Sequence, residues 1–344
     1  MLKLSFLVPI YNGERYLERL FSSLLSQNIP HSEYEIVCVD DCSKDHSVEV
    51  IERYQSQYPN IRLIRNKENS RVATNVNTLI SSALGKYFWI IGQDDYIEPN
   101  CISQLYERLE EERLDVLLFN YRRVFEDETT QSECKVFTSS PRQKGIDWIK
   151  QQFANRDYCQ YILGYEWRTV YRTDFWKEKN IRCIDGMNYE DTIIMMKAIV
   201  MSNAVASIDD VLYNYRINSG SITYRKDFVK RGDLIYEFAF MVGQEVEDFY
   251  YGLVKIDEQI AESLHRHLLQ RYNNFTFDLI RTPNSYKRAF YRLVRENRRY
   301  VNSKRPYLNW KARLLTSSIV GYPFACVSYY AYKINKSINQ LFEK

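Results

Sequence analysis

The first 120 residues alternate short apolar runs with longer segments whose apolar residues recur at helical spacing. The apolar runs are strand-like and cover residues 4–10, 34–39, 61–64, 87–91 and 115–120. The segments between them predict helices over residues 14–27, 45–58, 72–83 and 99–109, the last opened by Pro99. Strands that alternate with helices are typical of a mostly parallel, doubly wound sheet. The expected fold class is therefore α/β.

The rest of the chain changes character twice. Residues 125–145 are polar and rich in turn-forming residues, which predicts a loop or hairpin. A helix over 189–201 and short strands over 204–208 and 212–216 follow, and from about residue 228 the pattern is almost wholly helical. We therefore expect two domains, an α/β domain over residues 1–227 and a helical region over residues 228–344.

Polar side chains follow three of the predicted strands at the point where each strand ends. They are residues 11–14, the pair Asp40 and Asp41, and residues 93–95. Ligands of such sheets bind at the carboxyl ends of the strands. Asp94 and Asp95 form one pair of adjacent carboxylates, and Glu190 and Asp191, which precede the apolar helix at 192–199, form another. Adjacent buried carboxylates repel one another unless a cation or a proton intervenes, so we expect one pair to bind a metal and the other to act as a base.

The residue types at the strand ends suit a ligand that carries phosphate. The sequence contains no Gly-x-Gly-x-x-Gly after a strand and no Gly-Lys-Ser/Thr motif, which argues against a dinucleotide cofactor or a P-loop. Asp94 and Asp95 offer the hard oxygen ligands that Mg²⁺ or Mn²⁺ prefers. Tyr11 can stack on a base, Asp41 can accept a ring N–H, and Arg71 can neutralise a phosphate. Packing, helix capping and surface charge are the alternative roles of these three residues.

Charge is distributed unevenly along the chain. The net charge is +3, but residues 261–344 hold sixteen Lys or Arg and four Asp or Glu, so that this tail carries +12 and the rest −9. A basic tail favours an anionic partner, a membrane or a nucleic acid. Its aromatic residues form an apolar run and do not interleave with the basic ones, so we expect a membrane surface and no nucleic acid.

The apolar run is the uncharged segment at residues 314–332, with basic residues on both sides. Nineteen residues are enough to span a bilayer, but Ser, Thr, Gly, Pro and Tyr interrupt the segment. An interfacial or re-entrant segment is the preferred interpretation, and a spanning helix or an ordinary packed helix pair are the alternatives.

Cysteine and histidine usage narrows the possible cellular compartment and the possible kinds of catalytic site. The seven cysteines are scattered and include no Cys-x-x-Cys pair, which is typical of a reducing compartment. The opening residues read as a first strand, and we expect no signal peptide there. None of the four histidines lies near Asp94 and Asp95 or near Glu190 and Asp191 in the sequence, so a zinc site or a Ser-His-Asp triad is not expected.

Three motifs in this order resemble the family 2 glycosyltransferases of GT-A fold. They are LVPIYNGERYL at 7–17, VDDCSKDHS at 39–47 and DDYIEP at 94–99. Glu190 and Asp191, LYNYR at 212–216 and SIT at 221–223 resemble the later motifs of that family. The likeness covers residues 4–223. It implies a GT-A-type α/β fold with a C-terminal helical extension and an inverting transfer of a sugar from a nucleotide donor.

The resemblance also implies roles for individual residues. Pro9, Tyr11, Asn12 and Glu14 belong to the loop that embraces the nucleotide, which is expected to be uridine. Asp41 matches the group that reads the base, and Arg71 is expected near the phosphates. Asp94 and Asp95 match the end of the Asp-x-Asp element that holds Mn²⁺ or Mg²⁺ against the diphosphate. Asp191 matches the general base that deprotonates the acceptor hydroxyl, and Glu190 supports it.

Two positions depart from the family pattern. Gly92 stands where an Asp is frequent, so one carboxylate directed at the metal is missing. Thr74 stands where an Arg is frequent, and Arg71 is expected to supply the positive charge. On the acceptor side, Trp167 is either a stacking platform for a sugar or a core residue, and Arg168 or Arg172 can meet a lipid diphosphate.

The sequence therefore predicts an inverting, metal-dependent glycosyltransferase. The expected donor is a UDP-sugar, and the expected acceptor is a hydroxyl of a glycan or lipid-linked saccharide in surface polysaccharide synthesis. The expected location is the inner face of the cell membrane, with peripheral attachment through the basic tail. The alternative is an inactive or regulatory relative that binds a nucleotide sugar without turnover, and Gly92 motivates it.

Overall fold

The structure, a computed structural model, describes residues 2–125, 131–153, 165–187, 191–218 and 252–262, with single positions at 249, 291 and 325. The chain divides into two compact units, Met1–Ser221 and Ile222–Lys344. The segment 314–332 lies outside the described residues, apart from position 325, and so does most of the predicted helical region. The boundary expected near residue 228 stays a prediction.

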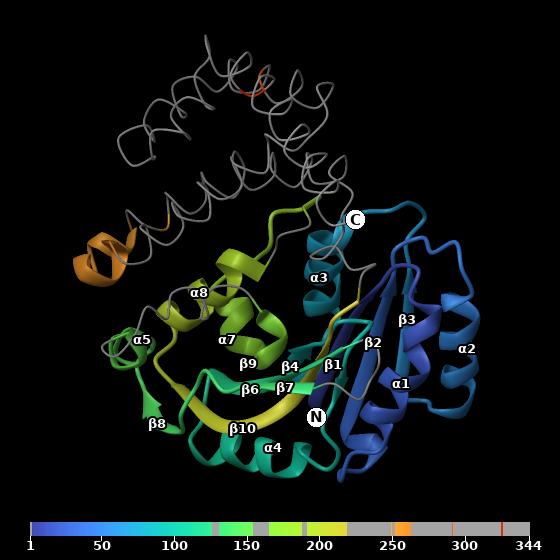
Figure 1. The fold of residues 1–344 in the computed structure, drawn as a ribbon, viewed down its shortest axis with the longest axis horizontal. Coiled ribbons are helices and arrows are strands. Elements are labelled where there is room, and N and C mark those ends of the chain that lie inside the picture. Colours follow the sequence, from blue (N-terminus) through green and yellow to red (C-terminus); the bar gives the residue numbers. More distant parts are fainter. Residues whose placement is uncertain are drawn as a thin grey trace, which may run out of the picture. The chain divides into compact units, whose positions relative to one another are not determined.

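Strands and helices alternate through the first unit (Figure 1). The strands are β1 (Leu2–Ile10), β2 (Tyr34–Asp40), β3 (Ile61–Arg65), β4 (Gly85–Ile90), β5 (Tyr96–Ile97), β6 (Val116–Val124), β7 (Gln131–Cys134), β8 (Ser140–Gln143), β9 (Thr169–Arg172) and β10 (Val205–Arg216). The helices are α1 (Glu14–Leu25), α2 (Ser47–Gln57), α3 (Arg71–Ser82), α4 (Ile102–Glu111), α5 (Gly145–Phe153), α7 (Thr173–Glu178) and α8 (Asp191–Met201), with 3₁₀ turns η1 (His31–Glu33) and η2 (Glu166–Arg168).

All ten strands belong to one sheet, whose main order is β3-β2-β1-β4-β9-β6-β10-β5. β1 pairs in parallel with β2 and β4, and β2 pairs in parallel with β3. β9 then lies antiparallel between β4 and β6, while β6 and β10 are parallel to each other. The sheet curls round beneath α7 and α8 (Figure 1). The predicted α/β class and doubly wound sheet are confirmed, and β9 marks where the simple parallel order ends.

The parallel half of the sheet is buried on both faces, as its apolar strands require. Because side chains alternate along a strand, Leu4, Phe6, Val8 and Ile10 of β1 join one core cluster with residues of α1 and α4. Leu7 points to the other face, where α3 packs against β1 and β2. The parallel pairing of β1 with β2 and β4 brings the carboxyl ends of these three strands together at one end of the sheet, which we call the sheet edge.

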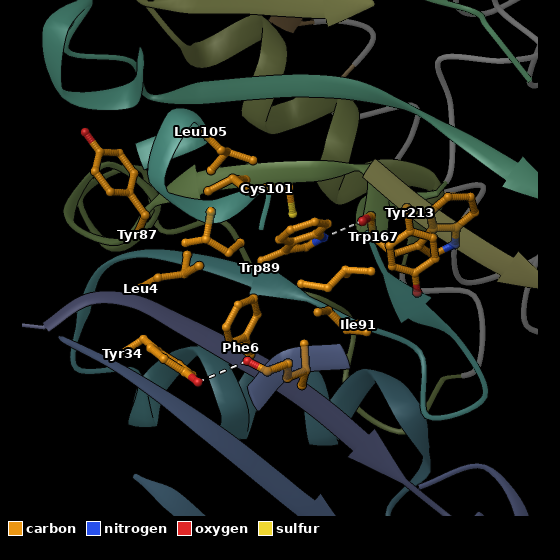
Figure 2. Packing of buried hydrophobic residues seen from close by; sticks show 14 of the residues in the cluster. Leu4, Phe6, Tyr34, Tyr87, Trp89, Ile91, Cys101, Leu105, Trp167 and Tyr213 are labelled. Carbon is orange, nitrogen blue, oxygen red and sulfur yellow. Dashed lines mark hydrogen bonds between the residues drawn. The ribbon is translucent and has the colours of Figure 1, made fainter. Parts of the chain in front are cut away.

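Trp89 of β4 fills the centre of the main cluster (Figure 2). Its ring lies 6.1 Å from that of Phe6 and 4.8 Å from that of Phe119, measured between centroids. Its indole N–H donates to the carbonyl of Trp167 at 2.5 Å, which satisfies the one polar atom of the ring. This bond fixes the segment before β9 against the centre of the sheet.

Three boundaries differ from those that the sequence predicts. The helix expected from Pro99 begins at Ile102, so Pro99 precedes the helix. The two short strands expected at 204–208 and 212–216 form one strand, β10, whose pairing with β6 shifts register between Ser207 and Tyr213. The segment expected as a loop or hairpin, residues 125–145, holds two strands in its described part: β7 pairs antiparallel with the preceding β6, as in a hairpin, and β8 pairs with β10. Polar residues at a bulge imitate a turn in sequence, which explains the split of β10.

Among the described residues, no helix is long and apolar enough to cross a membrane.

Gly85 offers a test of how tightly β4 lies against β1. A Cβ at this position would lie 2.6 Å from the carbonyl carbon of Leu4 and from the backbone nitrogen of Ser5. We expect Gly85→Ala to lower stability by about 1–3 kcal/mol, as overpacking does, and to lower the thermal midpoint of the full chain. Gly252→Ala is the control, because a Cβ there meets nothing within 4 Å. Equal midpoints for the two variants would contradict this packing.

Candidate functional site

The loop after β1 is held by Gln93, which follows β4. The backbone N–H of Tyr11 donates to Gln93 Oε1 at 2.8 Å, and Gln93 Nε2 donates back to the carbonyl of Tyr11 at 3.1 Å. Gly13 makes room for this amide, because a Cβ at Gly13 would lie 2.6 Å from Gln93 Oε1. Tyr11 stays 43% exposed, so its ring is accessible at the edge of the sheet. The sequence marks Gln93 only as part of a polar strand end and did not predict its role.

Two further predicted residues, Asn12 and Glu14, tie this loop to the loop after β2. Lys44 donates its backbone N–H to Asn12 Oδ1 at 2.7 Å, and His46 donates its own to Glu14 Oε2 at 2.7 Å. In return Asn12 donates its backbone N–H to Ser43 Oγ at 3.0 Å. Pro9 lies in β1 opposite Val39. The predicted nucleotide loop is therefore a braced structure, and Asn12 and Glu14 brace it.

Asp41 is buried at the carboxyl end of β2 and organises the start of α3. Its Oδ1 accepts the backbone N–H of Ser70 at 2.7 Å and the side-chain amide of Asn66 at 2.9 Å. Its Oδ2 accepts the backbone N–H of Arg71 at 3.0 Å. Asn66 also donates to Asn75 Oδ1 at 2.7 Å. The helix-capping alternative thus describes the contacts seen here, and no sequence pattern indicates the roles of Asn66 and Asn75.

Arg71 has a left-handed backbone, with φ of 67°. This conformation is unfavourable for a side chain of that size, and the bond from its N–H to Asp41 holds it. Its guanidinium is exposed and donates to the carbonyl of Gly186 at 3.2 Å. Arg71 and Asp41 therefore lie together at the carboxyl end of β2.

Asp94 and Asp95 follow β4 but face different surroundings. Asp95 is buried, and both of its oxygens are bonded within the protein: Oδ1 accepts the N–H of Arg216 at 2.8 Å and Oδ2 accepts the hydroxyl of Tyr213 at 2.6 Å. Burial, and then the charge of Asp94, raise the pKa of the Asp95 carboxyl well above its ordinary value. Asp94 is only half-buried, and its Oδ2 accepts the amide of Asn218 at 2.6 Å.

These contacts allow a test of the predicted metal site. Magnesium is usually held by one or two carboxylates together with substrate phosphates and water. Asp94, with its partly exposed carboxylate, fits that pattern as a single ligand. Both oxygens of Asp95 already accept protein hydrogen bonds, which favours Asp94 over Asp95 as the ligand. Within the described residues no group of three or more His, Cys, Asp or Glu is placed to hold an ion. Metal binding stays a prediction.

Gly92 is explained by the same carboxylate. A Cβ at Gly92 would lie 2.6 Å from Asp95 Oδ2 and 3.4 Å from Asp94 Oδ1. The backbone N–H of Gly92 donates to the Tyr213 hydroxyl at 3.0 Å, and that hydroxyl donates to Asp95. The Asp95 carboxylate therefore occupies the space that a side chain at position 92 would need.

An aromatic stack connects this carboxylate to the segment before β9. The Trp167 ring stacks on Tyr213 at 4.5 Å and on Tyr215 at 5.1 Å, between centroids. Figure 2 shows Trp167 and Tyr213 together at one end of the cluster. Trp167 is buried, so it is a core residue here. Arg172 donates from Nε and Nη2 to Asp115 Oδ1, at 3.0 and 2.7 Å, and is already paired.

The predicted base lies at the start of α8, which begins at Asp191. Glu190 and the side chain of Asp191 lie outside the described residues, and their assigned roles stay predictions.

The conflict between positions 92 and 95 can be tested by a double-mutant cycle. We expect Gly92→Ala to destabilise the protein by about 1–3 kcal/mol, because the new methyl group displaces the Asp95 carboxylate. In an Asp95→Ala background the same change should cost much less, since the clash is gone. Urea unfolding of the four proteins measures the coupling. Additive effects would contradict the arrangement.

Comparison with known proteins gives this geometry its context. The family model "Glycosyl transferase family 2" matches residues 5–169. Among curated relatives, TarS of Staphylococcus aureus, a poly(ribitol-phosphate) β-N-acetylglucosaminyltransferase, is 26% identical over 279 residues, which are 80% of this chain and 46% of TarS. GlyG of Streptococcus pneumoniae, named a glycosyltransferase, is 26% identical and matches 80% of this chain and 94% of its own length. This chain spans about half the length of TarS.

Solved structures agree in fold. The crystal structure of S. aureus TarS 1–349 with UDP-GlcNAc matches with a TM-score of 0.58 and 18% identity over 97% of this chain and 92% of that one. A second TarS crystal structure matches with a TM-score of 0.60 and 19% identity over 95% of this chain and 54% of that one. The family match, the motif order and the sheet topology agree: residues 5–169 match the family 2 glycosyltransferases, and the chain has the GT-A fold of the TarS structures.

Proposed function

We propose that this chain transfers a sugar from a UDP-sugar to a hydroxyl of a glycan or lipid-linked saccharide, with inversion, in surface polysaccharide synthesis. The observation that carries the proposal is the shared sheet edge where Tyr11, Asp41 and Asp94 follow β1, β2 and β4. The exposed ring of Tyr11 suits stacking on a base, and the buried carboxylate of Asp41 suits the N–H of that base. The partly exposed carboxylate of Asp94 suits a metal-bound diphosphate. The family match supports the reaction class, and the relatives' names support a polysaccharide context.

The donor would lie across the braced loops. Tyr11 would stack on the uracil, and Asp41 would accept its ring N–H. Asp41 already holds the N–H groups of Ser70 and Arg71, so donor binding and the position of Arg71 would be coupled. Arg71 would then bring its guanidinium to the diphosphate. Pro9 would shape the donor site from β1, and Asn12 and Glu14 would hold its loops in place through their side chains.

The transfer step would be a single displacement. Asp191 would remove the proton of the acceptor hydroxyl as its oxygen attacks the anomeric carbon from the face opposite UDP. Asp94 would hold Mg²⁺ or Mn²⁺, which when bound offsets the charge of the leaving diphosphate. Burial raises the pKa of Asp94 above its ordinary value, so a cation beside it would favour the ionised form.

The basic tail supports a place at the membrane. Sixteen Lys or Arg against four Asp or Glu over residues 261–344 would attract an anionic leaflet, and we include peripheral attachment to the inner face of the cell membrane in the proposal. Flotation of the full chain with vesicles that contain anionic lipid, compared with flotation with neutral vesicles, tests this attachment.

A donor-binding measurement tests the nucleotide site. We expect UDP to raise the thermal midpoint of the full chain, and Mg²⁺ or Mn²⁺ to add to that rise over EDTA. Asp94→Asn should remove the part that depends on the metal and keep the part that does not. Asp210→Asn, an exposed Asp of β10, is the matched control and should behave as wild type. No midpoint change with any nucleoside diphosphate would contradict the proposal.

A turnover measurement separates the enzyme from an inactive relative, an alternative that the missing carboxylate at Gly92 supports. We expect wild type to release UDP from a UDP-sugar in the presence of acceptor. Asp191→Asn should lower that rate by about 10²- to 10⁴-fold, as loss of a general base does, while UDP binding stays unchanged. If the wild type binds UDP tightly and shows no turnover across donors, the binding-only alternative replaces the enzyme.

A further inference from the structure

Arg168 is a buried cation that lacks a hydrogen-bond partner. Its side chain is fully buried, at 0% exposure. None of its three guanidinium nitrogens has a hydrogen-bond partner in the part of the chain that the structure describes. A guanidinium carries five N–H donors and stays charged at physiological pH, so burying it unpaired is strongly unfavourable. Such a group in a native protein calls for an explanation, and a missing ligand is one.

The contacts of Arg168 are with aromatic rings. Its guanidinium carbon lies 4.8 Å from the centroid of Phe137 and 5.2 Å from that of Tyr165. Ring faces attract the charge but accept no conventional hydrogen bond from the in-plane N–H groups. Burial lowers the pKa of Arg168 to about 10. The planar fork of donors therefore stays unused.

Arg172, in the same segment, differs from Arg168 because its guanidinium has hydrogen-bond partners within the protein. It makes two hydrogen bonds to the carboxylate of Asp115. Packing near β9 thus does not prevent an arginine from finding a protein partner. The difference between these two arginines points to a partner of Arg168 that comes from outside the described chain.

Tyr165 closes one side of this cation in an unfavourable conformation. Its backbone is left-handed, with φ of 74° and ψ of 54°, which is rare for a bulky residue. Its side chain is only partly buried, unlike that of Arg168. The partly exposed Tyr165 ring lies over the buried guanidinium, so a ligand that approaches from this side would have to displace that ring.

We propose that Arg168 is the anchor of a binding site for an oxyanion, a phosphate or a carboxylate, reached by displacement of Tyr165. A planar guanidinium binds either group through two parallel N–H···O bonds. Trp167, the preceding residue, stacks on Tyr213, whose hydroxyl bonds Asp95, so these contacts connect the segment that carries Arg168 to the strand end already described. If the proposed function holds, the oxyanion belongs to the acceptor, because the donor diphosphate is expected at Asp94. That last assignment alone rests on the proposed function.

The test uses the full chain and inorganic phosphate, with acetate as the carboxylate probe and chloride at equal ionic strength as the reference. We expect phosphate or acetate to raise the thermal midpoint of wild type above that in chloride. Arg168→Met should weaken this effect at least about tenfold in concentration, since a hydrogen bond to a charged group is worth that much or more. Arg142→Met, at an exposed arginine of β8, should leave it unchanged.

Two further readouts distinguish an anion site from a structural arginine. Without added oxyanion, Arg168→Met should unfold at a higher temperature than wild type, because an uncompensated buried charge has been removed. UDP should stabilise Arg168→Met as it stabilises wild type, which shows that the donor site is intact and separates this inference from the proposed function. Equal behaviour of wild type in phosphate, acetate and chloride would overturn the inference, even if the variant fails to fold. A lower midpoint for Arg168→Met with the anion effect retained would overturn it as well.

Discussion

The buried carboxylate of Asp95 joins the segment after β4 to β10. It accepts the hydroxyl of Tyr213 and the backbone N–H of Arg216, which lie 118 and 121 residues further along the chain. Losing either partner would leave a buried carboxyl oxygen of Asp95 unsatisfied, which costs the desolvation of that group. The bond to Gly92 through the Tyr213 hydroxyl extends the connection to the backbone of the turn. Asp94 is therefore presented outward because its neighbour is fixed inward.

The same connection orders the aromatic residues behind the site. Tyr213 receives the Trp167 ring on its face, and the Trp167 carbonyl accepts the indole N–H of Trp89. Tyr213 and Trp167 thus take part both in hydrogen bonds and in ring stacking. Support of this kind lets the half-buried carboxylate of Asp94 keep its position although Gly92 supplies no carboxylate beside it. It also fixes the backbone next to Arg168, the residue after Trp167.

The sequence predicts the strands of the parallel half and the residues at their ends because both signals are local. Apolar runs identify β1, β2 and β4, and polar residues at their ends identify Asp41 and Asp94. The partners of those residues are not local: Asn66 reaches Asp41 across 25 residues, and Gln93 reaches Tyr11 across 82. Adjacent carboxylates look equivalent in sequence, so the inward turn of Asp95 could not be read from it. The burial of Trp167 and the pairing of Arg172 depend on tertiary contacts in the same way.

The place of β9 in the sheet has a consequence for how the protein is made. β4 and β6 are separated in space by β9, although β9 is synthesised after both. Until the ribosome has added residues 169–172, the edge of β4 offers unpaired N–H and C=O groups to any passing strand. Pairing of β9 with both neighbours then requires a strand to enter between two others, a non-local step that slows folding. A nascent or truncated chain that ends before Arg172 would therefore carry an open, apolar sheet edge, and its main hazard would be association with its own copies.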